Sequence, residues 1–368
     1  MRVLHVVNVR WFNATSWYAL YLGKLLSNAG NKVLVLTLEN TETHDKAQKW
    51  GLETRIMDLN TKNPLKIAAL HFELKKLLET YRPDIVNCHR GEAFVLFGLL
   101  KKSLGAFRLV RTRGDQRPPR KNLVNKWLYG FASDAVVAPN SAMARHIEDN
   151  LGVPKDKIHL ILGGVDREKF SFDPHGRDRV REEFGIRPEH AVIGLLGRFD
   201  AVKGQKELIR AVSRLYHEHG QKQVRLLLIG FETATATREV EDWITESNIR
   251  DVTFITGERR DVPACVSALD VGVVASLWSE TIARAALEIM SCGRALVGSE
   301  VGVMPDLLSR EALVRPGDVE ALTNLLLRTL TDEKFTSGLR EEQALRMDGL
   351  SSEDFLRQTL ELYEGLLK

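Results

Sequence analysis

Two stretches in the second half of the chain combine side chains that could bind an anion. The first, GRFDAVKG at residues 197–204, follows the apolar run AVIGLL and carries two cations, Arg198 and Lys203, between glycines. The second, SLWSETIARAALEIMSCG at 276–293, follows the apolar run DVGVVA and carries Glu280 and Glu288 with seven residues between them. Parallel sheets bind ligands at the carboxyl ends of their strands. The pattern therefore predicts an anion site at one edge of a sheet.

The second stretch also predicts a helix that contributes to this site. Ser279 could cap the helix, so that its first free N–H groups point at the anion with the positive end of the helix dipole behind them. Glu280 would then lie beside the anion, and Glu288 about two turns, roughly 12 Å, further along. This span is similar to the length of a nucleotide sugar. Each stretch taken alone is also compatible with a solvated loop or a favourable dipole partner.

The elements that must position these residues form two series of strands and helices. Short apolar runs typical of buried strands alternate with helix-period segments, as in α/β domains with parallel sheets. The runs of the first series are RVLHVVN (2–8), KVLVLTL (32–38), DIVNC (84–88), RLVRT (108–112), DAVVA (134–138) and IHLIL (158–162). Those of the second are AVIGLL (191–196), VRLLLIG (224–230), VTFIT (252–256), DVGVVA (270–275) and ALVGSE (295–300).

The domain boundary is expected where this alternation lapses, in GGVDREKFSFDPHGRDR at 163–179. We predict two doubly wound, Rossmann-like domains, 1–170 and 171–351, facing each other across a ligand cleft. The last stretch, SSEDFLRQTLELYEGLLK, predicts a helix over 352–368 that completes the first domain. Its predicted apolar face consists of Leu356, Leu360, Tyr363 and Leu367.

The composition excludes several classes of protein. The chain has 368 residues with 52 basic and 49 acidic side chains, a balance that disfavours a dedicated nucleic-acid binder. Three separated cysteines form no disulfide framework or metal motif, and no G-x-G-x-x-G follows the first strand. The longest apolar run, FVLFGLL at 94–100, is far shorter than the roughly 20 residues that span a bilayer. We therefore expect a cytoplasmic protein without a metal or a resident cofactor.

Four segments in order resemble the motifs of the retaining glycosyltransferases of family 4, which have the GT-B fold. They are the two stretches described above, together with ILGGVDREKF at 161–170 and SEVGVMPDLL at 299–308. The resemblance implies that Arg198 and Lys203 bind the diphosphate of a UDP- or GDP-sugar. It also implies that Glu280 holds hydroxyls of the donor sugar and that Glu288 holds the ribose. Further donor-binding candidates are Gly197, Thr281, Ile282, Ala283 and, near the base in GERRDVPA, Arg259.

The chain departs from the family pattern on the acceptor side. Bulky Trp11 and Phe12 lie where many relatives have a Gly-Gly loop, and Arg113 lies where many have a histidine. An arginine stays protonated, so Arg113 cannot be a general base. His89 follows a predicted strand and could touch a sugar hydroxyl or be a structural histidine. Within 108–126 seven cations are opposed by only Asp115, which is typical of a solvated face or of a site for an anionic acceptor.

These observations predict a retaining transferase that moves a sugar from a nucleoside-diphosphate donor to a hydroxyl of a growing glycan or glycolipid, as in lipopolysaccharide or cell-envelope synthesis. The acceptor-side candidates are Arg113, Arg117, His89 and Trp11. The basic segment PLKIAALHFELKKLL at 64–78 predicts peripheral contact with the inner face of a membrane, provided that its apolar side is not used by the core. The alternatives are an inverting transferase, a nucleotide-sugar epimerase and a sugar-nucleotide-binding protein without turnover.

Overall fold

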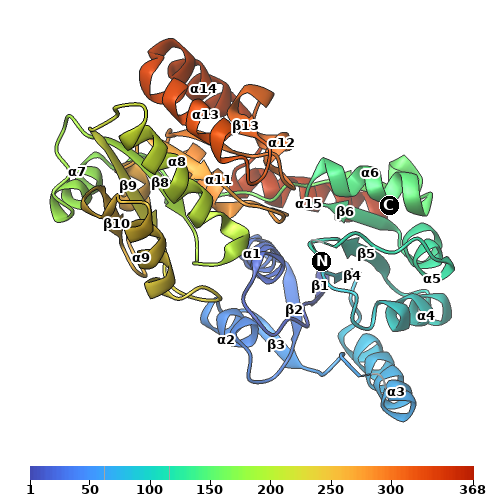
Figure 1. Cartoon of the computed structure of the whole chain (residues 1–368). Coiled ribbons are helices and arrows are strands. Elements are labelled where there is room, and N and C mark those ends of the chain that lie inside the picture. Colours follow the sequence, from blue (N-terminus) through green and yellow to red (C-terminus); the bar gives the residue numbers. More distant parts are fainter. Residues whose placement is uncertain (62, 116) are drawn as a thin grey trace. The chain divides into compact units, whose positions relative to one another are not determined.

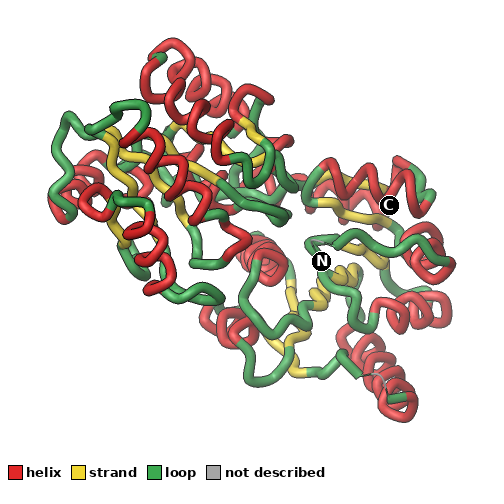
Figure 2. The backbone as a smooth tube through the Cα atoms, in the orientation of Figure 1, coloured by secondary structure: helices red, strands yellow, loops and turns green. Residues whose placement is uncertain are grey.

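The computed structural model describes residues 1–61, 63–115 and 117–368 and divides the chain into two compact units. The first unit comprises Met1–Gly163 and Ser352–Lys368, and the second comprises Gly164–Ser351. In both, helices flank the strands of a parallel sheet (Figures 1 and 2). The boundary lies at Gly163 rather than near residue 170. The segment that follows it belongs to the second unit, because Val165 donates a backbone hydrogen bond to Leu350 and Phe170 accepts one from Ser291.

In its described residues the first unit has a seven-stranded sheet in the order β3-β2-β1-β4-β5-β6-β7, with all neighbouring strands parallel. Every apolar run of the first series lies on one of these strands. The elements are β1 (Arg2–Val6), α1 (Ala14–Asn28), β2 (Lys32–Thr37), α2 (Glu42–Lys49), β3 (Glu53–Ile56), α3 (Pro64–Tyr81), β4 (Ile85–Cys88), α4 (Phe94–Leu104), β5 (Arg108–Thr112), α5 (Leu123–Trp127), η1 (Leu128–Ala132), β6 (Ala135–Ala138), α6 (Ser141–Leu151), η2 (Lys155–Lys157), β7 (Ile158–Leu160) and α15 (Ser352–Leu367).

Side-chain caps and an apolar stripe define the helices around this sheet. Asn13 accepts a hydrogen bond from the backbone of Ser16 at the start of α1, and Asn63 caps α3 just before Pro64. Helix α3 buries Leu70, Leu74, Leu77 and Leu78. The core therefore uses the apolar face of the segment considered above as a membrane contact, although Leu65 and Phe72 stay 83% and 70% exposed on α3.

Helix α15 joins the first unit through a face that differs from the predicted one. Its buried residues are Ser352, Phe355, Thr359, Leu362 and Tyr363, whereas Leu367 is exposed. The helix therefore lies rotated from the predicted face, of which only Tyr363 is fully buried. Two polar contacts explain this orientation: the Tyr363 hydroxyl accepts a 2.8 Å hydrogen bond from Asn87 on β4, and the Ser352 hydroxyl lies 2.5 Å from that of Tyr21 on α1.

In its described residues the second unit has a six-stranded parallel sheet in the order β10-β9-β8-β11-β12-β13. Every apolar run of the second series lies on one of its strands. Its elements are α7 (Pro174–Glu183), β8 (Ala191–Leu196), η3 (Ala201–Lys203), α8 (Gln205–His217), β9 (Val224–Ile229), α9 (Thr237–Glu246), η4 (Arg250–Val252), β10 (Thr253–Ile255), α10 (Val262–Ser267), β11 (Val271–Val274), α11 (Arg284–Ser291), β12 (Ala295–Ser299), α12 (Met304–Leu307), η5 (Arg310–Ala312), β13 (Leu313–Val314), α13 (Val319–Thr331) and α14 (Glu333–Arg346).

None of the helices in the described part of the chain combines the length and the apolar composition that crossing a membrane requires.

Candidate active site

The order of strands in the second unit brings the two predicted anion-binding stretches together. Strand β8 pairs with β11, with Val271 opposite Ile193. After β8 the chain continues to β9 on one side of this pair, and after β11 it continues to β12 on the other side. Such a reversal of direction is where doubly wound sheets bind their ligands. The loops 197–204 and 275–283 follow these two strands, so they lie on either side of the reversal point.

Backbone contacts hold the two loops against each other. The amide of Leu277 donates a 2.8 Å hydrogen bond to the carbonyl of Val202. Gly204 has a left-handed backbone with φ of +69°, and a Cβ at this position would collide with the carbonyl oxygen of Ala275. A side chain here would therefore push the loops apart. The backbone thus fixes the positions of the side chains that both loops present.

Both cations of the first loop are paired with carboxylates. The Lys203 ammonium forms an ion pair with Glu280, whose side chain is only 7% exposed. The Arg198 guanidinium lies 2.9 Å from Asp200 and is half exposed. The Ser276 hydroxyl lies 2.5 Å from the same Glu280 oxygen, Oε1, that contacts Lys203, and donates to it. An incoming diphosphate would therefore compete with one carboxylate at each cation.

The helix of the second stretch begins later than predicted. Helix α11 starts at Arg284, so Thr281, Ile282 and Ala283 lie in the loop before it and Ser279 is not its cap. The last loop residue, Ala283, has a left-handed backbone with φ of 45°. The carbonyl of Glu280 accepts a 2.8 Å hydrogen bond from the amide of Val303.

Gly302, just before Val303, lies so close to the Glu280 backbone that a Cβ would collide with it. The segment 299–308 therefore fixes the main chain of Glu280 outside a helix. Glu280 and Glu288 do not lie two turns apart on one helix.

Glu288 lies on α11 and is almost completely buried. Its carboxylate accepts a 3.1 Å hydrogen bond from Arg284, one turn before it. Burial raises the pKa of Glu288 above its usual range, and Arg284 and Lys169 offset only part of this rise. The ionised carboxylate is thus poorly solvated, and hydroxyl donors from a ligand would stabilise it.

Replacing this carboxylate by the neutral amide is expected to stabilise the ligand-free protein. Because the pKa of Glu288 is raised by folding, the ionised form costs stability at every pH above its pKa in the unfolded chain. Glu288→Gln should therefore raise Tm at pH 7, by about 2–4 °C for each kcal/mol gained in a unit of this size. Calorimetry of Glu288→Gln checks this result, with exposed Glu341→Gln as the control. A lower Tm would show that the contact with Arg284 outweighs burial.

Arg259 is held by two acidic side chains. Its guanidinium donates two hydrogen bonds to Glu183 on α7, at 2.6 and 2.9 Å, and two to Asp261, at 2.9 and 3.0 Å. Four of its five N–H donors are thereby used. One N–H on Nη1 is left over, so a nucleotide base that contacts this side chain can bind there without opening any of these contacts.

In the first unit the corresponding reversal of direction lies between β1 and β4, and a buried pair of histidines occupies it. His5 on β1 and His89 directly after β4 contact each other with ring centroids 4.7 Å apart. Both side chains are fully buried, so His89 does not present its ring to a ligand in this conformation. Neither ring nitrogen of His89 has a partner among the described residues. Burial lowers the pKa of His5 to about 4 and lowers that of His89 as well, which keeps both rings neutral at pH 7.

The histidine pair is expected to make the first unit sensitive to acid. The unfolded chain takes up a proton on each ring near pH 6.5, whereas folded His5 does so only near pH 4. Stability is therefore retained above pH 6.5 and falls as the pH drops from 6.5 to 4, by about 3 kcal/mol for His5. Urea unfolding at pH 7 and pH 4.5 measures this loss. His5→Phe should flatten the dependence, and an unchanged slope would contradict the assignment.

Several arginines line a cavity of the first unit. A cavity of about 650 Å³ follows the ends of β4 and β5 and is lined by Arg90, Arg111, Arg113, Arg117 and Arg120 among other residues. Asp115 contacts Arg90 at 2.8 Å, Arg111 at 3.2 Å and also Arg113, and a second carboxylate, Glu92, lies 2.9 Å from Arg90. Burial lowers the pKa of Arg113 to about 10, which leaves it protonated at neutral pH. Asp115 thus forms ion pairs with three arginines.

Trp11 lies elsewhere in the first unit, at a larger cavity, and its side chain is 70% exposed. Its neighbour Phe12 instead packs edge-on against Trp50, with ring centroids 6.0 Å apart. The residues that the sequence proposed for the acceptor side therefore occupy three environments: Arg113 and Arg117 at the arginine-lined cavity, His89 in the core, and Trp11 at the larger cavity.

Sequence reasoning missed some residues that now stand out. Ser276 contacts Glu280 four residues further on, a spacing that would also bring the two side chains together on a helix, so this spacing is the signal that could have found it. Asp200 and Arg90 lie next to residues that the motifs singled out, and their charge is the only signal that could have found them. Within residues 1–61, 63–115 and 117–368 no group of three or more acidic, histidine or cysteine side chains is placed to hold a metal ion.

Comparison with known proteins places this geometry in a family. The family model described as Glycosyltransferase Family 4 matches residues 15–169, and the one described as Glycosyl transferases group 1 matches 190–332. The chain is 30% identical over 197 residues to a D-inositol 3-phosphate glycosyltransferase of Xylanimonas cellulosilytica, which covers 51% of this chain and 46% of that protein. The match thus spans about half the length of that relative.

Two further similarities extend over more of the chain. It is 26% identical to the UDP-Gal:alpha-D-GlcNAc-diphosphoundecaprenol alpha-1,3-galactosyltransferase of Escherichia coli, over 71% of this chain and 70% of that protein. The fold is similar to that of HepE from Anabaena, solved in complex with UDP, with a TM-score of 0.86 at 19% identity over 99% of this chain and 100% of HepE. Two family models that together match most of the chain, and two doubly wound units of the GT-B type, show that the protein belongs to glycosyltransferase family 4.

Proposed function

We propose that the protein is a retaining glycosyltransferase that moves a hexose from a UDP- or GDP-sugar to a hydroxyl of a phosphorylated glycan or glycolipid, without a metal or a resident cofactor. The observation that carries the proposal is the placement of Lys203 and Arg198 after β8, next to Glu280 after β11, at the reversal point of the second sheet. Cations for a diphosphate and a carboxylate for sugar hydroxyls thus come from adjacent strands.

Donor binding exchanges the partners of the two cations. The diphosphate takes the place of Glu280 at Lys203 and of Asp200 at Arg198, and charge-assisted hydrogen bonds replace the internal ion pairs. Helix α8 adds to this site because its N-terminus follows Gly204 directly and has no side-chain cap. We assign the backbone groups of Gly197, Thr281, Ile282 and Ala283 to the same site, because they lie in the two loops that follow β8 and β11. Arg259 would contact the base through its one remaining N–H, on Nη1.

The carboxylates then recognise the hydroxyl groups of the donor. Glu280, released from Lys203 and still oriented by Ser276, accepts hydrogen bonds from the sugar. Glu288 accepts hydrogen bonds from the ribose, which stabilise its poorly solvated carboxylate. The site thereby distinguishes a nucleotide sugar from a plain diphosphate by its hydroxyls.

The transfer proceeds on one face of the sugar. The bond from the anomeric carbon to the diphosphate oxygen breaks, and the acceptor oxygen bonds to that carbon from the same side. The acceptor proton passes to the departing diphosphate, whose growing negative charge Lys203 and Arg198 stabilise. Glu280 does not act as a covalent nucleophile in this scheme, because its carboxylate is oriented by Ser276 and accepts hydrogen bonds from the sugar hydroxyls. Isolation of a glycosyl adduct on Glu280 by mass spectrometry would contradict it.

The arginine-lined cavity supports an anionic acceptor. Five arginines line it, and Asp115 and Glu92 are the carboxylates that they face there. The names of two relatives contain a phosphorylated compound, D-inositol 3-phosphate in one and a diphosphoundecaprenol in the other. A phosphate that enters the cavity would share the arginines with Asp115. We place Arg113 and Arg117 in this role.

Apolar side chains near this cavity support peripheral contact with the cytoplasmic face of a membrane. Leu123 and Phe131, on α5 and η1, are 84% and 81% exposed, and the basic residues Arg120, Lys121 and Lys126 lie in the same segment. Exposed apolar side chains among cations favour the surface of an anionic bilayer. The acceptor would then be a glycolipid of that membrane.

Charge reversal tests the acceptor assignment. Arg117→Glu with Arg120→Glu should raise KM for a phosphorylated acceptor about tenfold or more and reduce the salt dependence of transfer, because two exposed cations at the cavity become anions. UDP affinity should stay unchanged. The matched control is Arg145→Glu with Lys155→Glu, two exposed cations of the first unit outside the cavity. Unaltered transfer in the Arg117→Glu, Arg120→Glu variant would show that these cations are only part of a solvated surface.

Two measurements test the function itself. A thermal-shift screen with UDP-, GDP- and ADP-sugars identifies the donor, since a ligand at 100 times its Kd stabilises the fold by about 2.7 kcal/mol. NMR of the product then gives the anomeric configuration. A retained configuration supports the proposal, whereas inversion or epimerised donor indicates another chemistry. Binding of every tested donor without transfer or hydrolysis would indicate a binding protein.

A further inference from the structure

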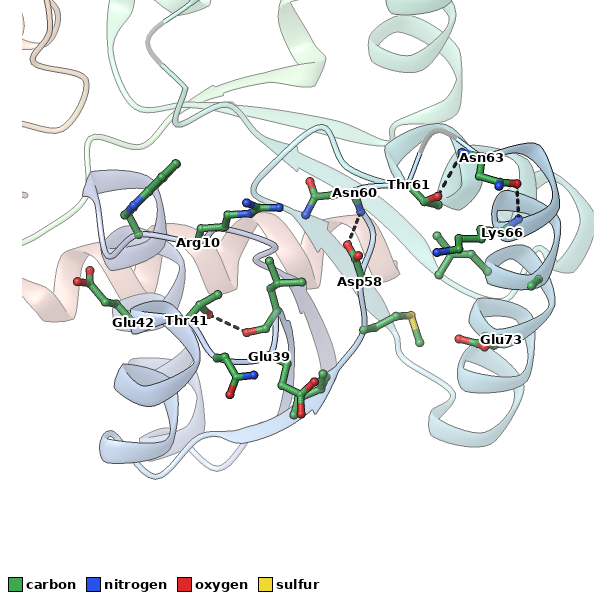
Figure 3. A pocket seen from close by; sticks show the side chains of 17 residues that line it. Arg10, Glu39, Thr41, Glu42, Asp58, Asn60, Thr61, Asn63, Lys66 and Glu73 are labelled. Carbon is green, nitrogen blue, oxygen red and sulfur yellow. Dashed lines mark hydrogen bonds between the residues drawn. The ribbon is translucent and has the colours of Figure 1, made fainter.

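A large cavity in the described residues lies within the first unit and takes no part in the chemistry above. It measures about 1,510 Å³ and follows the carboxyl ends of β1, β2 and β3, with one wall formed by the start of α3 (Figure 3). Sites for drug-sized molecules measure about 300–1,000 Å³. The cavity therefore has room for more than one ring of a sugar chain.

An exposed tryptophan at this cavity is held in place by its own backbone. The carbonyl of Trp11 accepts hydrogen bonds from Asn13 at 3.0 Å, from Thr43 at 3.1 Å and from Ser16 at 3.3 Å. The next residue, Phe12, donates its amide to Glu42 at 3.1 Å. These contacts tie the loop after β1 to α1 and α2 and leave the indole 70% exposed. These contacts hold the backbone that carries the indole, and an exposed aromatic ring on such a loop can stack against a ligand.

The polar side chains of the cavity offer donors and acceptors that the protein does not use. Arg10, Glu39, Lys66 and Glu73 form no side-chain hydrogen bond or ion pair with other described residues, although all four line the same space. Arg10 and Lys66 extend toward each other from opposite sides, with Asn60 between them (Figure 3). A ligand that can both donate and accept hydrogen bonds along its length would satisfy both kinds of group.

The charges decide between classes of ligand. The lining contains four carboxylates, those of Glu39, Glu42, Asp58 and Glu73, against the two cations Arg10 and Lys66. This excess of negative charge opposes a phosphate, in contrast to the arginine-lined cavity of the same unit. Sugar hydroxyls donate to carboxylates and accept from Arg10, Lys66 and Asn60, while the apolar face of a pyranose ring can lie on the indole.

We propose that this cavity is a binding site for an uncharged oligosaccharide, with Trp11 as the stacking residue and Glu39, Glu73, Arg10 and Lys66 as the hydroxyl-binding groups. In the reaction proposed above, this oligosaccharide is the part of the acceptor distant from the phosphate. That assignment of the ligand rests on the proposed function, whereas the binding site itself does not.

Binding measurements on the full chain without donor test the proposal. Maltotetraose, chitotetraose and β-1,4-galactotetraose serve as probes, and saturation-transfer NMR with a titration of tryptophan fluorescence gives Kd. At least one probe should bind, and Trp11→Ala should weaken its binding about tenfold or more, which corresponds to 1.4 kcal/mol. Glu39→Gln with Glu73→Gln should weaken it as well. Phe131→Ala removes a comparably exposed ring outside the cavity and should leave Kd unchanged.

These measurements distinguish a failure of the oligosaccharide site from a failure of the proposed function. Each variant is also titrated with UDP, which tests the second unit. Oligosaccharide binding that depends on Trp11 supports the cavity even if UDP does not bind. Failure of all three probes, binding that Trp11→Ala leaves intact, or binding of spermine in place of sugars would overturn it, whatever the result with UDP.

Discussion

Lys203→Ala is expected to lower kcat for sugar transfer by about 10²- to 10³-fold and to weaken UDP binding far less. The departing diphosphate gains negative charge as its bond to the sugar breaks, so the contact with Lys203 is stronger in the transition state than in the bound donor. In the free protein Lys203 already has a partner in Glu280. Part of the binding energy of its contact with the donor is therefore offset by the loss of that ion pair, whereas the gain in the transition state is not.

Steady-state kinetics and a UDP titration measure the two effects of Lys203→Ala separately. Lys206→Ala is the matched control: it removes a lysine three residues on, whose ammonium lies 5.2 Å from the centre of the Trp243 ring. The control should transfer sugar at a rate close to that of the native protein. Native turnover in Lys203→Ala would show that the diphosphate binds elsewhere. A large loss of UDP affinity with unchanged kcat would show that Lys203 contributes to ground-state binding only.

Glu280→Gln is expected to lower kcat about 10²-fold while UDP affinity stays the same or increases. The amide keeps the size of the side chain and removes the charge that accepts the sugar hydroxyls. It also releases Lys203 from its internal ion pair, so the diphosphate no longer competes with a carboxylate for that ammonium. The opposite changes in turnover and affinity distinguish this role from a general loss of structure.

Isothermal titration with UDP and an assay with the intact donor test Glu280→Gln. Glu300→Gln, an exposed carboxylate at the start of the segment 299–308, is the control and should leave both measurements unchanged. Weaker UDP binding in Glu280→Gln would mean that the carboxylate supports the diphosphate site rather than opposing it. Native turnover in Glu280→Gln would show that Glu280 takes no part in the reaction.

Most of the fold follows from the sequence because the central strands are apolar on both faces. Each quoted run became a strand, but β3 and β13 were not predicted. Strand β3 has the sequence ETRI, lies at the edge of its sheet and is mostly exposed, so it lacks the apolar signal of a buried strand. Strand β13 has two residues, Leu313 and Val314, which are too few to show a period.

The candidate site was predictable at the level of loops and less so at the level of atoms. The sequence indicated that 197–204 and 276–293 share a sheet edge, and the pairing of β8 with β11 confirms this. The predicted start of α11 was wrong because Gly302 and Val303, about twenty residues further on, hold the backbone of Glu280 out of the helix. Contacts between such distant segments leave no periodic signal. The same limit applies to His89, whose burial depends on its packing against His5 from another strand.

The return of α15 to the first unit has a consequence for the order of events during synthesis on the ribosome. Residues 1–163 emerge without the helix that supplies Phe355 against Tyr18, with ring centroids 4.6 Å apart, and Tyr363 against Asn87. At about 5–20 residues per second, the 188 residues of Gly164–Ser351 take roughly 10–40 s to follow. During that time the surface that α15 covers has no partner. The second unit, although later in the chain, is the first whose residues are all present, so the nascent first unit is where chaperone binding and premature termination should matter most.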